Sequence, residues 1–160
     1  MSGVDHHAPG VAVAALTDDA VYVELIADRH HVHPALWPII GRSKPADRLL
    51  LVSDGTSLAG TGARQAVLGG LAVEVTGDRA TLVATGGLAG SLIALDSAVR
   101  NLAAEGVPLP AAVAAGSRNP LALLGVTDRG RLAVGQRADL VELDEELNVR
   151  RVMLAGEWVA

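Results

Sequence analysis

The chain has 160 residues, of which half are apolar but only 2% are aromatic, and it carries a net charge of −5. This length allows one domain with a sizeable core, which must be built from aliphatic side chains. The negative charge argues against a nucleic-acid or anionic-membrane partner, and the lack of cysteine excludes disulfides and a thiolate nucleophile. We recognise neither a signal peptide nor a bilayer-spanning apolar stretch, so we expect a cytoplasmic protein.

The first elements of the chain predict a parallel β-α-β unit. Residues 11–16 favour a short helix or a buried connection, and residues 21–27 favour a largely apolar strand. A short helix over 34–44 is expected to be interrupted at Pro38. The apolar run of a second strand, over 49–53, indicates burial on both faces, as in parallel sheets. Strand, helix and strand in this order imply a parallel pair.

A β excursion and further helices follow the second strand. Residues 66–84 alternate in the manner of two or three strands, and the Gly-rich residues 86–91 predict a flexible loop. The apolar period then favours a helix over 92–105. A second helix is expected over 111–118, with Asn119-Pro120 at its end.

The last segment of the chain predicts a small antiparallel layer. Residues 138–143 favour a strand, and residues 149–159 favour a hairpin around Ala155-Gly156. We therefore expect two parts, an α/β part over 1–126 and a β layer over 127–160.

Asp54 stands directly after the buried strand over 49–53. Barrels and open α/β sheets place their chemistry at the carboxyl ends of such strands. An Asp-Gly turn closing a hairpin has the same local sequence, so these residues alone leave both interpretations open. A Ser-His-Asp triad around Asp54 has no nucleophile-elbow motif to support it.

Three histidines follow the strand over 21–27. In an extended segment His31 and His33 point to the same face, where two imidazoles can bind Zn²⁺. We favour the alternative, in which one histidine lines a pocket and the others are solvated, because the sequence shows no further ligand cluster. The Gly-rich loop over 85–91 either presents backbone N–H groups to an anion or is a mobile connector.

Seven motifs, taken together and in order, resemble one family. They are PG at 9–10, IADRHHVH at 26–33, LLVSDG at 50–55, GGLAGS at 86–91, AVRNL at 98–102, NP at 119–120 and GRLAVGQRADLVELD at 130–144. The set is similar to the C-terminal half of the N-acetylglucosamine-6-phosphate deacetylases, within the amidohydrolase superfamily. The last motif is shared by many amidohydrolases, whereas the IADRHHVH, SDG and LAGS motifs are those specific to the deacetylases.

The resemblance implies an α/β fold, namely the C-terminal part of a (β/α)₈ TIM-type barrel beside part of a small β-sandwich. Residues 21–27 and 49–53 would be barrel strands seven and eight, each with its following helix. The strands after residue 138 would belong to the sandwich. This agrees with the parallel unit and antiparallel layer expected above.

The activity implied is hydrolysis of the N-acetyl group of N-acetylglucosamine 6-phosphate to glucosamine 6-phosphate and acetate, a step of amino-sugar catabolism. A divalent metal, Zn²⁺ or similar, would polarise the amide and activate water. Asp54 matches the catalytic aspartate, and His31 matches a substrate-contacting histidine. The resemblance assigns further substrate contacts to Asp28, Arg29, His30, Leu88, Ala89, Gly90 and His7. At the position of His7 the family typically carries an arginine that binds the sugar phosphate, and a histidine would bind it in a pH-dependent way.

The metal ligands of the family, a Glu and two His, precede the matching segment, so we assign no metal residue in this chain. Two barrel strands cannot close a barrel, and their open edges invite association. We therefore expect the chain alone to be inactive and either marginally folded, aggregation-prone or oligomeric, as a homodimer or with a missing N-terminal half. The alternative is a non-catalytic fragment or interaction module. A dihydroorotase-like cyclic amidase would keep the superfamily, but the LAGS motif argues against it.

Overall fold

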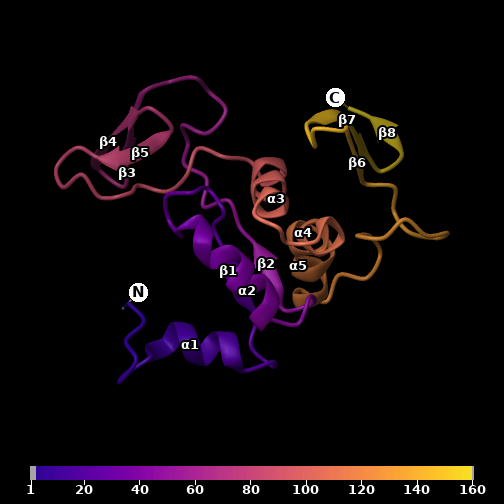
Figure 1. Ribbon diagram of the computed structural model, residues 1–160. Coiled ribbons are helices and arrows are strands. Elements are labelled where there is room, and N and C mark those ends of the chain that lie inside the picture. The colour runs from indigo at the N-terminus through magenta and orange to yellow at the C-terminus, as the bar shows by residue number, and fades with distance from the viewer. Residues whose placement is uncertain (1–2, 160) are drawn as a thin grey trace.

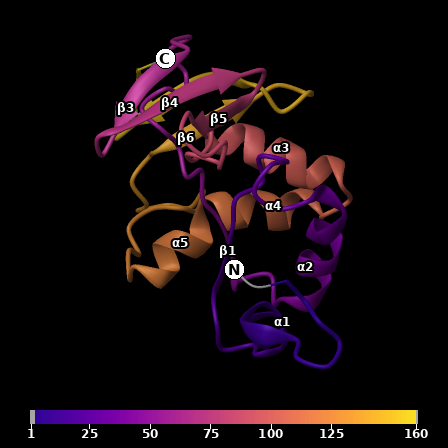
Figure 2. The same cartoon turned by 90° about the vertical axis from the view of Figure 1, so that its left-hand side faces the viewer.

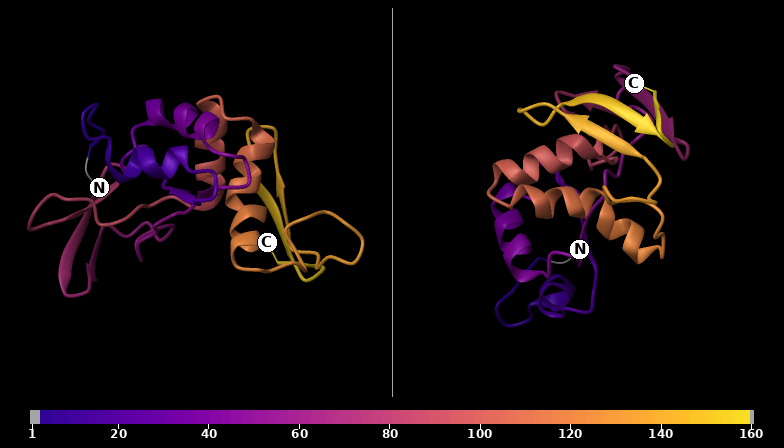
Figure 3. Two further views of the ribbon diagram at one scale, coloured as in Figure 1. Left: turned by 90° about the horizontal axis from the view of Figure 1, so that it is seen from below. Right: turned by 90° about the vertical axis from the view of Figure 1, so that its right-hand side faces the viewer.

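The computed structural model describes residues 3–159. Two three-stranded sheets lie at opposite ends of the molecule, and a two-stranded parallel sheet with most of the helices lies between them (Figure 1). The view from below shows the same separation (Figure 3), while the side view projects the two outer sheets onto one another (Figure 2). None of the described helices is long and apolar enough to cross a bilayer.

The central parallel unit confirms the predicted β-α-β order. It comprises α1 (Gly10–Thr17), β1 (Val23–Leu25), the 3₁₀-helix η1 (Pro34–Leu36), α2 (Trp37–Ser43) and β2 (Leu49–Leu51). β1 pairs with β2 in parallel, with Val23 opposite Leu49. The hairpin interpretation of Asp54 is therefore wrong, because the strand before it has a parallel neighbour. Pro38 is the second residue of α2, in the first turn, where its missing N–H leaves no helical bond unmade, whereas we expected it to interrupt a helix.

Lys44, directly after α2, connects α1 to the rest of the central unit. This buried side chain donates through Nζ to the carbonyl oxygens of Ala15, at 3.0 Å, and Asp18, at 2.6 Å. A cation at the C-terminus of a helix satisfies its last carbonyls and complements the helix dipole. α1 is almost wholly apolar, yet none of its residues is buried. An apolar helix exposed in this way fits the expected tendency to associate, which stays a prediction.

The excursion over 66–84 is a three-stranded antiparallel sheet, as predicted. Its strands are β3 (Gln65–Leu68), β4 (Leu71–Thr76) and β5 (Arg79–Leu82). Gly77, with φ of 64°, lies in the turn between β4 and β5. Val73 and Ala80 point to one face of the sheet and, together with Leu58, form a small core of their own.

Three helices pack beside β2, namely α3 (Leu95–Ala104), α4 (Leu109–Gly116) and α5 (Arg118–Leu123). α4 starts two residues earlier than predicted, because Pro110 fits its first turn. Asn119 and Pro120 lie within α5, so the prediction that they end the preceding helix is wrong. The main core joins these helices to the parallel pair, with Leu25, Trp37 and Leu102 among its buried side chains.

Asn119 supports the outer edge of β2. Its side chain is 1% exposed, and Nδ2 donates to the carbonyl oxygens of Ala46, at 2.7 Å, and Leu49, at 2.8 Å. Replacing Asn119 with Ala leaves the buried carbonyl of Leu49, and that of Ala46, without this donor, so we expect a loss of about 1–3 kcal/mol in the free energy of unfolding. Urea denaturation measures it. Asn148→Ala, at an exposed asparagine, is the matched control and is expected to change stability by less than about 0.5 kcal/mol. Equal losses in the two variants would contradict the role of Asn119.

The C-terminal strands form the predicted antiparallel layer, with β6 (Leu140–Leu143), β7 (Val149–Leu154) and β8 (Glu157–Trp158). The guanidinium of Arg100 in α3 donates to the carbonyl oxygen of Leu147, at 2.6 Å, and so ties this sheet to the helices. Across residues 3–159 the strands form three separate sheets and no closed barrel. The assignment of β1 and β2 to barrel strands seven and eight, and the domain boundary at 126–127, stay predictions.

Candidate functional site

The carboxyl ends of β1 and β2 bring three predicted site residues together. Because the two strands are parallel, the segments that follow them meet at the same edge of the sheet. The His31 imidazole lies between two carboxylates, with Nδ1 2.7 Å from Asp28 Oδ2 and Nε2 3.3 Å from Asp54 Oδ2. Asp28 and His31 are largely buried, whereas the Asp54 side chain is 52% exposed. Asp54 is therefore the member of this cluster that a solute can reach.

Asp28 fixes the orientation of His31. Its Oδ1 accepts the backbone N–H groups of His30 and His31, both at 2.9 Å, while Oδ2 contacts the His31 ring. Burial raises the pKa of the Asp28 carboxyl, but the hydrogen bonds from His31 and His30 outweigh it, so this pKa lies below its usual 3.8. Because an ionised carboxylate can only accept a hydrogen bond, Nδ1 of His31 donates to Asp28, and Nε2 faces Asp54.

The lowered pKa of Asp28 predicts that this carboxylate stabilises the fold above about pH 4 and loses that effect in acid. The contribution is complete above the unfolded-state pKa and disappears as the pH falls through the lower folded-state pKa. We expect Asp28→Asn to lower the free energy of unfolding at pH 7 by about 1–3 kcal/mol and to flatten its decline in acid. Urea denaturation from pH 3 to pH 7 measures both effects. Asp19→Asn, at an exposed aspartate, is the control, and an Asp28→Asn variant with wild-type pH dependence would contradict the prediction.

The loop carrying Leu88, Ala89 and Gly90 approaches the backbone of Asp54. A Cβ placed on Gly90 would lie 2.7 Å from the Asp54 carbonyl oxygen, and Gly90 has φ of 85°. Leu88 forms an antiparallel bridge with Thr81, and the N–H of Ala89 donates to Ala80, at 2.9 Å. The loop is thus bonded along β5, and both the flexible-loop and the mobile-connector interpretations are wrong for these residues.

Arg29 and His30 follow Asp28 in sequence, but their side chains turn away from Asp54. The Arg29 guanidinium lies 3.0 Å from Glu105 Oε1, and His30 Nε2 lies 3.2 Å from Asp78 Oδ2 without the geometry of a hydrogen bond. Arg29 has φ of 71°, so the backbone reverses here and sends the two side chains elsewhere.

His33 and His7 have local contacts. His33 Nδ1 accepts the N–H of Ala35 and caps η1, so it does not form the zinc-binding pair with His31 that an extended segment would have allowed. His7 donates its backbone N–H to Asp5 and packs against His6 near the N-terminus.

The described residues do not by themselves form a metal site. Within residues 3–159 no group of three or more His, Cys, Asp or Glu side chains is placed to hold an ion. The divalent metal implied by the resemblance therefore does not fit the residues of this chain alone.

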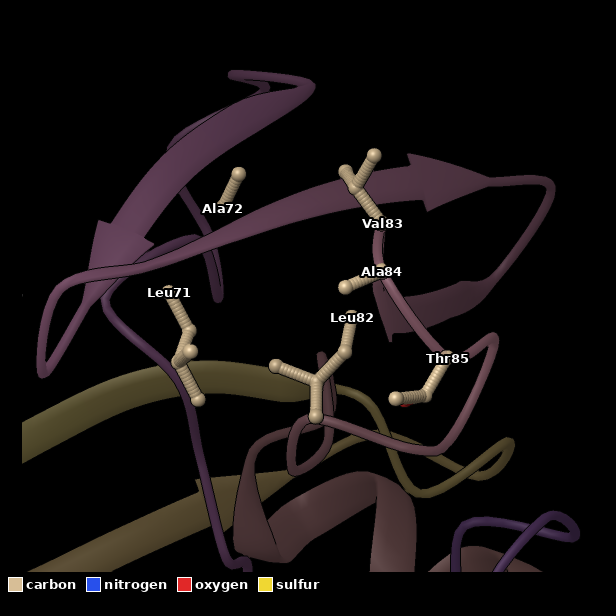
Figure 4. Close-up of a pocket in the computed structure, with 6 residues that line it drawn as sticks. All are labelled: Leu71, Ala72, Leu82, Val83, Ala84 and Thr85. Carbon is tan, nitrogen blue, oxygen red and sulfur yellow. The ribbon is translucent and has the colours of Figure 1, made fainter.

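Two hollows lie away from the cluster. One, of about 220 Å³, lies at β4 and the end of β5, where Leu71 and Leu82 extend from the same face of the sheet (Figure 4). The other, of about 520 Å³, lies between α3, α4 and the C-terminal sheet and is mostly apolar. Neither is lined by Asp28, His31 or Asp54.

Sequence reasoning missed two supports of the site. Asn101 Nδ2 donates to the carbonyl oxygen of Ala27, at 2.9 Å, immediately before Asp28. The Ser91 hydroxyl donates to the carbonyl oxygen of Ser53, immediately before Asp54. Two signals in the sequence could have found them. Asn101 is a polar residue beside the buried Leu102, and Ser91 is a serine at the end of the Gly-rich loop.

The sequence of this chain is similar to known amidohydrolases. The model of the amidohydrolase family matches residues 6–159. A putative N-acetylgalactosamine-6-phosphate deacetylase of Escherichia coli is 38% identical over 98% of this chain and 94% of its own length. The N-acetylglucosamine-6-phosphate deacetylase of Danio rerio is 37% identical over 96% of this chain, but the match covers 40% of that protein.

Solved structures agree with the sequence comparison. A mutant N-acetyl-D-glucosamine-6-phosphate deacetylase of Mycobacterium smegmatis, in complex with N-acetyl-D-glucosamine 6-phosphate, superposes with a TM-score of 0.92 at 37% identity. The Thermotoga maritima N-acetylglucosamine-6-phosphate deacetylase gives 0.89 at 36% identity. The chain is covered to 99% and 98%, but it spans only 42% and 43% of those two proteins.

Proposed function

The chain belongs to the amidohydrolase family, and from this premise we propose that it supplies the acid–base carboxylate and the sugar-contacting segments for deacetylation of N-acetylglucosamine 6-phosphate. The observation that carries the proposal is the Asp28–His31–Asp54 cluster at the carboxyl edge of the parallel pair. In this cluster the exposed carboxylate of Asp54 lies beside the His31 imidazole, and Asp28 fixes the orientation of that ring.

Asp54 is proposed as the general base and then the general acid. Its carboxylate takes a proton from the water that attacks the amide carbonyl, and returns it to the sugar nitrogen as the C–N bond breaks. The products are glucosamine 6-phosphate and acetate. His31, held by Asp28, is proposed to contact the substrate through Nε2, the atom that faces Asp54.

The remaining contacts are proposed from the family motifs. Leu88, Ala89 and Gly90 would line the sugar through their backbone, which the bonds to β5 keep in place. Arg29 and His30 would act through the backbone of their segment, since their side chains face Glu105 and Asp78. His7 would approach the sugar phosphate. We also propose that β1 and β2 are strands seven and eight of a barrel completed outside the described residues, in a cytoplasmic, homo-oligomeric enzyme.

The implied metal enters no step above, because residues 3–159 offer no set of ligands for it. We propose that these residues do not hydrolyse the amide without further ligands from outside them. One equivalent of tightly bound metal on this chain alone would contradict the proposal.

N-acetylgalactosamine 6-phosphate is a second candidate substrate. Two Escherichia coli relatives named for that sugar are each 38% identical to this chain, as high as the 38% of the bovine N-acetylglucosamine-6-phosphate deacetylase. Both sugars carry the same N-acetyl group and 6-phosphate, so the cluster would act on either in the same way.

The test is a chimera in which residues 3–159 replace the matching part of the Mycobacterium smegmatis deacetylase. Acetate release from the two sugar phosphates is expected, and the ratio of the two kcat/KM values names the substrate. A folded chimera that binds neither sugar phosphate and releases no acetate would favour the alternative of a non-catalytic interaction module. Binding of N-acetylglucosamine 6-phosphate to the chain itself, followed at the 88–90 amides by NMR, tests the sugar contacts without catalysis.

A further inference from the structure

Asp54 has an unusual backbone conformation for a residue with a side chain. Its φ is 49°, in the left-handed region, where the Cβ crowds the following carbonyl oxygen. Such a conformation persists only when the surrounding structure determines it. Aspartate adopts this conformation more readily than most residues, and the bonds that neighbouring segments make to residues 53–56 stabilise it here.

Ser91 makes hydrogen bonds on both sides of Asp54. Its N–H donates to the Asp54 carbonyl oxygen, at 2.7 Å, and its carbonyl oxygen accepts the N–H of Thr56, at 3.0 Å. Its hydroxyl donates to the carbonyl oxygen of Ser53. The residue is 2% exposed, and the Ser91 hydroxyl also lies 3.4 Å from the N–H of Ile93, which limits its rotation.

The segment that carries Ser91 is anchored on its other side. The N–H of Ala89 donates to Ala80 in β5, and Leu88 bridges Thr81. Gly90 passes so close to the Asp54 carbonyl that a Cβ would lie 2.7 Å from it. The segment that contacts Asp54 is therefore fixed to β5 by hydrogen bonds and is not a free loop.

We propose that Ser91 is a positioning residue, which holds the Asp54 peptide in its left-handed conformation and so directs the carboxylate toward His31. Each polar group of Ser91 has a partner within residues 53–56, so the residue acts on Asp54 without touching the substrate. Its importance for hydrolysis rests on the proposed function of Asp54.

The experiment is NMR on the whole chain carrying Ser91→Ala. The wild type is expected to show ¹³Cα and ¹³Cβ shifts of a left-handed residue at Asp54 and an NOE between its Cβ protons and the His31 ring. Ser91→Ala keeps the two backbone bonds but removes the hydroxyl that holds the Ser53 carbonyl, so it is expected to shift the Asp54 carbons toward random-coil values, to weaken the NOE and to exchange the Thr56 amide proton about fivefold faster. Ser117→Ala removes another serine hydroxyl that bonds a carbonyl, that of Val113 at 2.7 Å, and is expected to change none of these signals.

Unchanged Asp54 shifts and NOE in a folded Ser91→Ala variant would overturn the inference. If that variant does not fold, amide exchange of the wild type decides: Ser91 and Thr56 are expected to exchange at least about tenfold slower than the exposed Gly60 and Gly62. Equal rates would overturn the inference. Neither readout uses catalysis, so the two proposals can fail separately. If the bonds of Ser91 are found but the protein is inactive, only the proposed function is refuted. If the protein is active but these bonds are absent, only the positioning role is refuted.

Discussion

Replacing Asp54 with Asn is expected to lower kcat for acetate release by about 10²–10⁴-fold in the chimera described above. The amide has nearly the same shape and tolerates a left-handed backbone, but it cannot accept a proton from water. KM is expected to change little, because the sugar contacts come from His31 and the 88–90 backbone. Steady-state kinetics on N-acetylglucosamine 6-phosphate measures both parameters.

Asp47→Asn is the matched control for this substitution. Asp47 lies shortly before β2, is exposed and contacts Arg48, so its replacement is expected to change kcat by less than about twofold. Acetate release that persists at the wild-type rate in Asp54→Asn would remove the role proposed for Asp54. If Asp47→Asn lowered kcat by the same factor, the effect would come from impaired folding and not from the Asp54 carboxylate.

Replacing Gly90 with Ala is expected to lower both stability and activity. The new Cβ would meet the Asp54 carbonyl oxygen at 2.7 Å and Thr56 Cγ2 at 2.9 Å, and Gly90 has φ of 85°. The left-handed backbone costs about 1–2 kcal/mol and the overpacking about 1–3 kcal/mol. We expect the free energy of unfolding to fall by about 2–5 kcal/mol in total. The displaced carboxylate is expected to lower kcat by about 10²-fold.

Gly86→Ala separates the two causes. Gly86 belongs to the same loop and has φ of 69°, but a Cβ there has nothing within 4 Å. The Gly86→Ala variant is therefore expected to lose stability through backbone strain alone, without a clash with Asp54, and to keep the kcat of the wild type. Urea denaturation and acetate release of the two variants, side by side, measure the difference. Equal stability and equal kcat of Gly90→Ala and Gly86→Ala would show that the close contact between Gly90 and Asp54 has no effect on either property.

The parallel pair and the two antiparallel sheets were predictable because their signals are local. An apolar run such as 49–52 is long enough for a strand and too apolar for an exposed one, and the Gly-containing turns around 77 and 156 join consecutive antiparallel strands. The position of Asp54 after a buried strand was readable for the same reason. Helix ends were predicted less well, because Pro110 and Pro120 are compatible with a first turn as well as with a break.

The sequence by itself determined the types of the elements, the aliphatic core and the presence of a carboxylate at the end of β2. Only the tertiary structure decided which groups hold that carboxylate. Ser91 meets Ser53 across 38 residues and Asn101 meets Ala27 across 74, and the turn at Arg29 sends His30 to Asp78 while His31 remains beside Asp28 and Asp54. Hydrogen bonds of this kind depend on distances between backbone groups that are set by packing, and residue spacing along the chain does not encode them.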